Sequence, residues 1–85
     1  MALYEIVFKK SVSKDLKKIP KKDVLKILTV IRSLAENPRP PQVKKLSGQE
    51  RYRMRQGDFR ILYSIEDDVL VITVVKVGNR RDVYR

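Results

Sequence analysis

The chain has 85 residues, which leaves room for a single domain over residues 1–85. Twenty lysine and arginine residues against ten acidic ones give a net charge of +10, so nucleic acid is the expected partner, ahead of an acidic protein or a membrane surface. The chain has no cysteine and no histidine, which excludes disulfides, thiolate nucleophiles, zinc sites built on these residues and imidazole acid–base chemistry.

The N-terminal half predicts one strand and two helices. Residues 3–8 alternate between apolar and polar, as a half-buried strand does. Apolar side chains over residues 11–19 recur at helical spacing beneath a lysine-rich face, and Pro20 ends this short helix. Residues 21–36 carry a broad apolar stripe with a period of 3.6, which predicts a second helix.

The C-terminal half predicts three strands. Residues 50–56 alternate basic and apolar, and residues 59–65 follow a Gly-Asp turn. After an Asp-Asp turn, residues 69–77 are apolar on both faces, which is typical of a strand that is covered on both sides.

The expected order is β-α-α-β-β-β, an α+β fold. The last three strands should form an antiparallel meander, and the two helices should pack as a hairpin on one face of this small, mostly antiparallel sheet. The first strand can join only through the long helical crossover, beside the last long strand and parallel to it. The opposite sheet face, or a groove along it, is then left for function.

Arginines at alternate positions are the most informative local feature. Arg51, Arg53 and Arg55 share one face of a strand, with about 7 Å between neighbours. This spacing suits successive phosphates. A merely solvated strand face is the alternative, but lysine would serve there equally well, whereas arginine offers a planar, bidentate fork.

Further basic residues and one phenol follow. Arg60 lies inside an otherwise apolar strand, where solvation alone is a costlier explanation. Arg80 and Arg81 follow a glycine just past the core strand, where a terminal segment could fold back over the same face. Tyr84 is either a hydrophobic anchor or exposed, or it stacks on a base or donates a proton.

The acidic residues do not suit a metal-dependent nuclease, which needs clustered carboxylates. Asp67 and Asp68 fall in a predicted turn, and no second acidic cluster faces the arginines. We therefore expect no metal and no other cofactor. Any RNA cleavage would then use the 2′-hydroxyl of the substrate as nucleophile.

These features together resemble the RelE toxins of the RelE/ParE superfamily. The segments that carry the resemblance are Lys45-Leu46-Ser47-Gly48, Tyr52-Arg53-Met54-Arg55, Gly57-Asp58-Phe59-Arg60-Ile61-Leu62-Tyr63, Val77-Gly78-Asn79-Arg80 and Val83-Tyr84. With the upstream strand and helices, the likeness covers nearly the whole chain.

The resemblance implies a toxin that inhibits translation as a metal-independent, ribosome-dependent endoribonuclease. Such toxins enter the A site of the 70S ribosome and promote attack of a ribose 2′-oxygen on the adjacent phosphate of the messenger RNA. It also implies a cognate, RelB-like antitoxin from a neighbouring gene, and binding to operator DNA only through the antitoxin complex. No signal-like or membrane-spanning run is present, so we expect a cytoplasmic protein with no membrane partner.

The resemblance assigns catalytic roles to five positions. Arg60 and Arg80 would neutralise phosphate and transition-state charge, Arg53 and Arg55 would align the substrate, and Tyr84 would stack or transfer a proton. The expected contacts to RNA and ribosome are Arg51, Lys44, Lys45 and Arg81.

Two departures from the family pattern leave the general base open. The best-known members carry lysine where this chain has Arg53 and Arg55, and arginine stays protonated. Many relatives have histidine or lysine at the position of Asn79. The base is then Tyr84, one of the two lysines at 44 and 45, or a group of the ribosomal RNA.

Two other functions fit the same fold. One is a ParE-like toxin that inhibits DNA gyrase without cutting RNA, although such a toxin need not keep Arg60, Arg80 and Tyr84. The other is a non-catalytic RNA- or ribosome-binding module, for which the net charge alone suffices.

Overall fold

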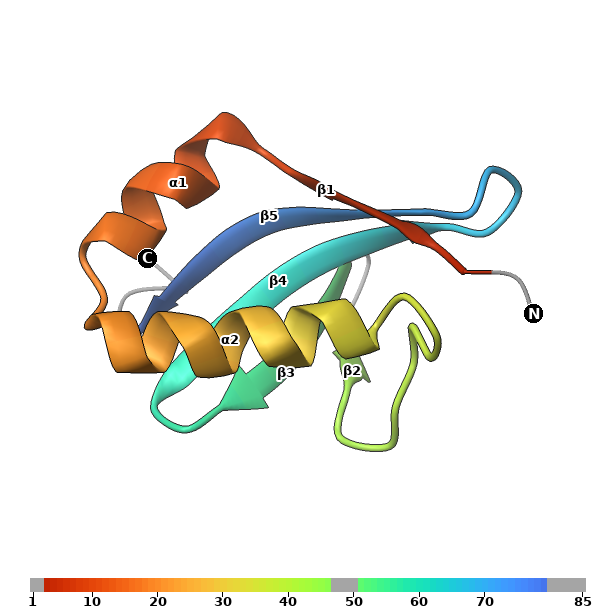
Figure 1. Ribbon diagram of the computed structural model, residues 1–85. Helices are drawn as coiled ribbons and strands as arrows, with labels where there is room; N and C mark the ends of the chain where they lie inside the picture. The colour runs from red at the N-terminus through yellow and green to blue at the C-terminus, as the bar shows by residue number, and fades with distance from the viewer. Residues whose placement is uncertain (1–2, 47–50, 80–85) are drawn as a thin grey trace.

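The computed structural model describes residues 3–46 and 51–79 (Figure 1). The elements in this part are β1 (Glu5–Phe8), α1 (Lys10–Lys17), α2 (Lys21–Ser33), β2 (Lys44–Lys45), β3 (Arg51–Gln56), β4 (Phe59–Glu66) and β5 (Val71–Asn79). Among the described residues, no helix is long and apolar enough to cross a membrane. The predicted site residues Arg80, Arg81 and Tyr84 lie outside the described residues.

The strands form one sheet in the order β1-β5-β4-β3-β2. β3, β4 and β5 pair antiparallel in sequence, as the predicted meander requires. β1 pairs with β5 in parallel, and the chain leaves β1 through the helical crossover. β5 therefore lies between two neighbours, in agreement with its apolar character on both faces, and the predicted α+β fold is confirmed.

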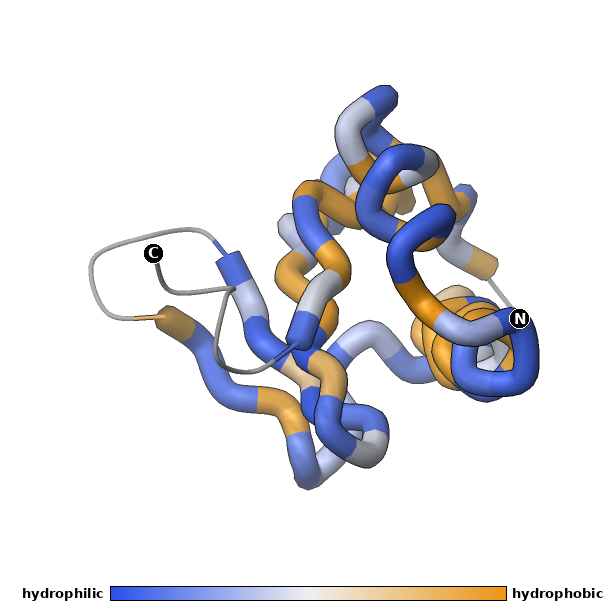
Figure 2. The backbone as a smooth tube through the Cα atoms, turned by 90° about the vertical axis from the view of Figure 1, so that its left-hand side faces the viewer, coloured by the Kyte–Doolittle hydropathy of each residue, from blue (hydrophilic) through white to orange (hydrophobic). Residues whose placement is uncertain are grey.

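Both helices cover the same face of the sheet. Figure 2 views α2 almost along its axis, and the strands lie to one side of it. The core forms between these layers from Val12, Ile27, Ile31, Leu34, Tyr52, Met54, Ile61, Tyr63, Ile65, Ile72, Val74 and Val77. Burying a side chain of this size stabilises the fold by roughly 1.5–3 kcal/mol, so the helices are held by their apolar stripes.

Several elements differ from the sequence prediction. β1 begins at Glu5, and α2 ends at Ser33. The two-residue strand β2 was not predicted, because two residues cannot show a period and its pairing with β3 alone defines it. Val69 and Leu70 belong to the turn rather than to β5, and Leu70 has a φ of 55°, a left-handed conformation that cannot continue a strand.

A bulge in β5 decides which face its last residues use. Tyr63 pairs with Val74, whereas the preceding Leu62 pairs with Lys76, so Val75 is an extra residue in the ladder. A shift by one residue moves every following side chain to the other face. Because of it, Asn79 lies opposite Phe59.

Candidate nucleic-acid interface

The sheet face opposite the helices carries the arginines of β3. Tyr52 and Met54 are buried against the core, while Arg51 and Arg55 are exposed and Arg53 is half-buried. The alternation predicted from the sequence is therefore present. It places the three guanidinium groups on the face that the helices leave open.

Cross-strand pairing then sets positive charges directly opposite one another. Arg55 pairs with Arg60 of β4, and Arg53 pairs with Lys44 of β2. Like charges at directly opposed positions destabilise a sheet. Two such pairs side by side concentrate positive charge on this face, as a surface that binds an anion does.

These side chains surround a cavity of about 270 Å³ that we call the basic hollow. The residues lining it are Gln42, Lys44, Arg53, Arg55 and Arg60. Four of the five are cationic, and no described aspartate or glutamate lines it. Arg60 is half-buried and its Nε atom is fully buried. Arginine forks and a lysine around one small cavity match the charge and the geometry of phosphate oxygens.

With this geometry in view, the comparison with known families is informative. The family model of the ParE toxin of type II toxin–antitoxin systems matches residues 6–84. The protein designated toxin RelE1 of Methanocaldococcus jannaschii is 33% identical over 86 residues, which is 96% of each chain. This chain is a RelE-type member of the RelE/ParE toxin superfamily.

Solved structures agree with this assignment of the toxin. The archaeal RelE of Pyrococcus horikoshii OT3, crystallised in a complex with RelB, is 31% identical with a TM-score of 0.83, over 95% of this chain and 99% of that chain. The isolated RelE toxin of Escherichia coli is 22% identical with a TM-score of 0.78, over 95% of this chain and 90% of that one, and supports the fold alone.

The structure brings together only some of the predicted site residues of the toxin. Arg53, Arg55, Arg60 and Lys44 meet around the basic hollow. Arg51 shares their face but pairs with Ser64 and does not line the hollow. Lys45 pairs with Tyr52, whose side chain faces the core, so it belongs to the other face.

Gln42 is a residue of this site that was not predicted from the sequence. It follows two prolines on the connection that leads from α2 to β2, and it lines the basic hollow beside Lys44. A lone glutamine in a loop carries no signal of its own. Only the pairing of β2 with β3 brings it beside the arginines.

A second polar group of the toxin, which we call the Arg39 cluster, consists of Tyr4, Arg39, Tyr52, Tyr63 and Asp67. Arg39 donates from Nη2 to Oδ2 of Asp67 at 2.9 Å and from Nη1 to Oδ1 at 3.2 Å, and its Nε donates to the Tyr52 hydroxyl at 3.2 Å. The Tyr4 hydroxyl donates to Asp67 at 2.6 Å. The rings of Tyr52 and Tyr63 stack with centroids 5.8 Å apart.

The pKa values of the Arg39 cluster shift as these contacts require. The hydrogen bonds from Arg39 and then Tyr4 lower the pKa of Asp67 below its usual 3.8. The hydrogen bond to Asp67 raises the pKa of Tyr4, and burial raises the pKa of Tyr63, whose hydroxyl donates to the Pro38 carbonyl at 2.7 Å. The cluster ties the start of β1, the loop after α2 and the turn between β4 and β5 together.

Proposed function

We propose that this toxin is a metal-independent endoribonuclease that cuts messenger RNA in the A site of the ribosome. The observation that carries the proposal is the pair of like-charged cross-strand contacts around the basic hollow, Arg55 with Arg60 and Arg53 with Lys44. Such a concentration of positive charge around one cavity favours a polyanion as the ligand.

The reaction uses the substrate's own nucleophile. The ribose 2′-oxygen forms a bond to the adjacent phosphorus, the bond from phosphorus to the 5′-oxygen breaks, and the products are a 2′,3′-cyclic phosphate and a 5′-hydroxyl. Negative charge grows on the phosphoryl oxygens in the transition state, where preorganised guanidinium groups stabilise it. Arg60 has this role, because it lines the hollow and is half-buried there. Arg53 and Arg55 align the RNA backbone.

The two protons of the reaction need an acceptor and a donor. We assign the acceptor to Lys44, because Lys44 lines the basic hollow whereas Lys45 belongs to the other face of β2. Tyr84 is proposed as the donor to the leaving 5′-oxygen and Arg80 as a further phosphate contact, both on the family pattern.

The proposed partners are an antitoxin and the ribosome. The Pyrococcus horikoshii relative was solved with RelB, and we propose a RelB-like antitoxin for this toxin as well. A net charge of +10 favours association with ribosomal RNA and with the acidic parts of an antitoxin. A cytoplasmic location follows from these partners.

Primer extension on a defined translation complex tests the proposal. Purified toxin should produce messenger RNA cuts in phase with the codons, and the cut ends should be a 2′,3′-cyclic phosphate and a 5′-hydroxyl, as the metal-independent mechanism requires. Intact message at toxin concentrations that saturate the ribosome would contradict the proposal.

Gyrase inhibition is the second candidate, because the matching family model is described as ParE. A supercoiling assay with purified gyrase distinguishes the two functions. Loss of supercoiling with intact message would favour the ParE-like function. Ribosome binding with neither effect would favour a non-catalytic module.

A further inference from the structure

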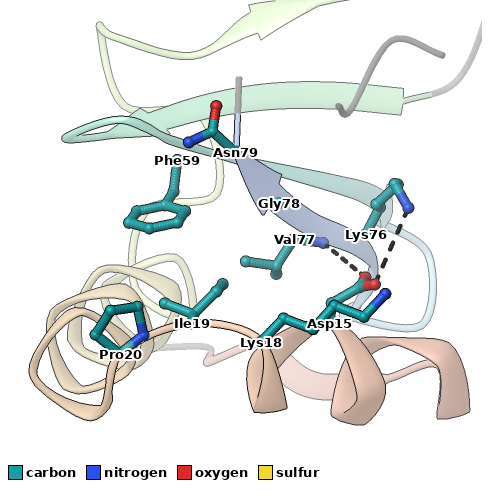
Figure 3. Close-up of a pocket in the computed structure, with 9 residues that line it drawn as sticks. All are labelled: Asp15, Lys18, Ile19, Pro20, Phe59, Lys76, Val77, Gly78 and Asn79. Carbon is teal, nitrogen blue, oxygen red and sulfur yellow. Dashed lines mark hydrogen bonds and ion pairs between the residues drawn. The ribbon is translucent and has the colours of Figure 1, made fainter. Parts of the chain in front are cut away.

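A second cavity lies at one end of the sheet, between the junction of the two helices and the end of β5 (Figure 3). We call this cavity, of about 370 Å³, the end hollow. Its apolar wall consists of Ile19, Pro20, Phe59 and Val77. In Figure 3 the Phe59 ring points toward Ile19 and Pro20, and the Asn79 amide lies above it at the rim.

The end hollow has the size and the wall of a small-ligand site. Ligand cavities are typically about 300–1,000 Å³, with apolar and aromatic walls and a few polar groups that orient the ligand. Phe59 is half-buried, so one part of its ring is accessible for stacking. The amide of Asn79 has both donor and acceptor atoms, which is what reading the edge of a nucleobase requires.

The charges at the rim favour an anionic ligand. Asp15 is the one carboxylate among the described residues that line the cavity, and it accepts a hydrogen bond from the Val77 backbone N–H at 3.2 Å and lies 4.0 Å from the Lys76 ammonium. Lys18 and Lys76 outnumber it, which gives the rim a net charge of +1.

The cavity next to the end hollow has a net charge of the opposite sign, which sets the side toward which a phosphate of the ligand points. Its described lining residues include Asp23 and Asp58 against a single lysine, Lys26, for a net charge of −1. A phosphate group is therefore repelled there and is attracted toward Lys18 instead.

The sheet register links the end hollow to the basic hollow. Gln56, Phe59 and Asn79 form one row across β3, β4 and β5, and Arg55, Arg60 and Gly78 form the next row, on the opposite face. Rows are about 3.3 Å apart along a strand. The end hollow and the basic hollow therefore lie at the same end of the sheet, on its two opposite faces.

We infer that the end hollow binds one nucleobase of a single-stranded RNA, stacked on Phe59 and oriented by Asn79, while the adjoining phosphate contacts Lys18. This inference rests on the proposed function and extends it, because a site that holds another base of the bound RNA would give the cleavage a base preference. Stacking on an aromatic ring alone accepts every base, so the preference must come from Asn79.

Fluorescence anisotropy with a short labelled single-stranded RNA, in the absence of ribosomes, tests the inference. Phe59→Leu keeps an apolar side chain but removes the ring, and the affinity should fall about tenfold. The salt dependence of binding should stay the same, because no phosphate contact is lost. The matched control is Phe8→Leu, since Phe8 is the other phenylalanine of the chain and lies 40% exposed on β1. Its affinity should be unchanged.

Asn79→Ala tests the base preference. Across oligomers of A, C, G and U, the wild-type toxin should prefer one base, and the variant should bind all four with similar affinity. Wild-type affinity in Phe59→Leu, or a preference that survives in Asn79→Ala, would overturn the inference.

Photocrosslinking of wild-type toxin covers the case in which Phe59→Leu does not fold. A 4-thiouridine oligomer should crosslink to the peptide that contains Phe59, and crosslinks confined to β3 would overturn the end hollow as a base site. If codon-phased cleavage is still observed together with such a result, the proposed nuclease activity is not contradicted. If Phe59→Leu binds RNA tenfold more weakly but wild-type toxin leaves the message in the translation complex intact, the nuclease activity is contradicted and the base site is not.

Discussion

Arg39 and Arg60 lie near opposite ends of β4 and show two uses of the same side chain. Arg39 donates two hydrogen bonds to Asp67 and a third to Tyr52, so its charge is neutralised by groups that also join three segments of the chain. Arg60 instead lies directly opposite Arg55, in a hollow lined by two further cations.

The difference between these arginines separates stability from binding. An arginine with a carboxylate partner contributes to the folded state, whereas arginines that face one another oppose it. Changes in the Arg39 cluster should therefore lower the free energy of unfolding and leave the chemistry largely intact. Changes in the basic hollow should lower the cleavage rate and leave the free energy of unfolding largely intact.

The largest expected effect is that of Arg60→Ala. Removing one preorganised group that stabilises transition-state charge typically costs about 10²–10³ in rate. The single-turnover cleavage rate on a stalled translation complex should fall by this factor, while the Tm changes little. Arg32→Ala is the matched control, because Arg32 is an exposed arginine of α2. A comparable loss in the control would indicate that net charge alone matters.

Neighbouring lysines on opposite faces give the next largest contrast. Lys44→Gln should lower the cleavage rate by about 10²-fold, as expected for loss of a general base. Lys45→Gln removes the same charge one residue along and should cleave nearly as fast as wild type. Equal rates in both variants, measured in the same single-turnover assay, would remove Lys44 from the mechanism.

A smaller effect is expected at Arg55, through the salt dependence of binding. Each lost phosphate contact reduces the slope of log K against log salt by about 1. Arg55→Ala should therefore bind RNA more weakly than wild type at low salt, and the two should converge as salt is raised. Anisotropy titrations at several salt concentrations measure this slope, and parallel lines for the two proteins would contradict a phosphate contact.

In the Arg39 cluster, Asp67→Asn should lower the Tm at pH 7 by a few degrees and barely change cleavage. The folded-state pKa of Asp67 is lowered, so its contribution to stability is present above pH 3.8 and is lost as the pH falls through the folded-state value. The Tm difference between wild type and variant should accordingly shrink in acid. Thermal unfolding followed by circular dichroism from pH 7 to pH 3 checks this, and a constant difference would argue against the ion pair.

The smallest effect is expected at Tyr63. Its raised pKa means that stability is complete below pH 10 and is lost as the pH rises toward the folded-state value. Tyr63→Phe removes the hydrogen bond to Pro38, at a cost of about 1 kcal/mol at neutral pH. The variant should lose less stability than wild type between pH 9 and 11 in urea titrations, and an identical alkaline decline would contradict a buried, neutral phenol.

The hydrophobic periodicity of the sequence predicted which side chains share a face of a strand and which strand lies between two others. The alternation over residues 51–55 correctly assigned Arg53 and Arg55 to one shared face of their strand, and the apolar run of β5 placed that strand between two others. The parallel pairing of β1 also followed, because the helices leave no other short connection.

The features that the sequence did not predict depend on contacts between segments far apart in the chain. Tyr4, Arg39 and Asp67 meet only after the sheet has formed, so no local pattern indicates the Arg39 cluster. The bulge at Val75 likewise follows from the pairing of β4 with β5, and it places Asn79 beside Phe59. The assignments of Arg80, Arg81 and Tyr84 stay predictions.

The most direct measurement compares two variants of this toxin on the same preparations, Arg55→Ala/Arg60→Ala and Asp67→Asn, by single-turnover message cleavage and by Tm. The first should lose codon-phased cleavage while largely keeping its Tm, and the second should cleave like wild type with a lowered Tm. Undiminished cleavage in the first variant, or a fall in its Tm large enough to explain the lost activity, would contradict the basic hollow as the site of the reaction.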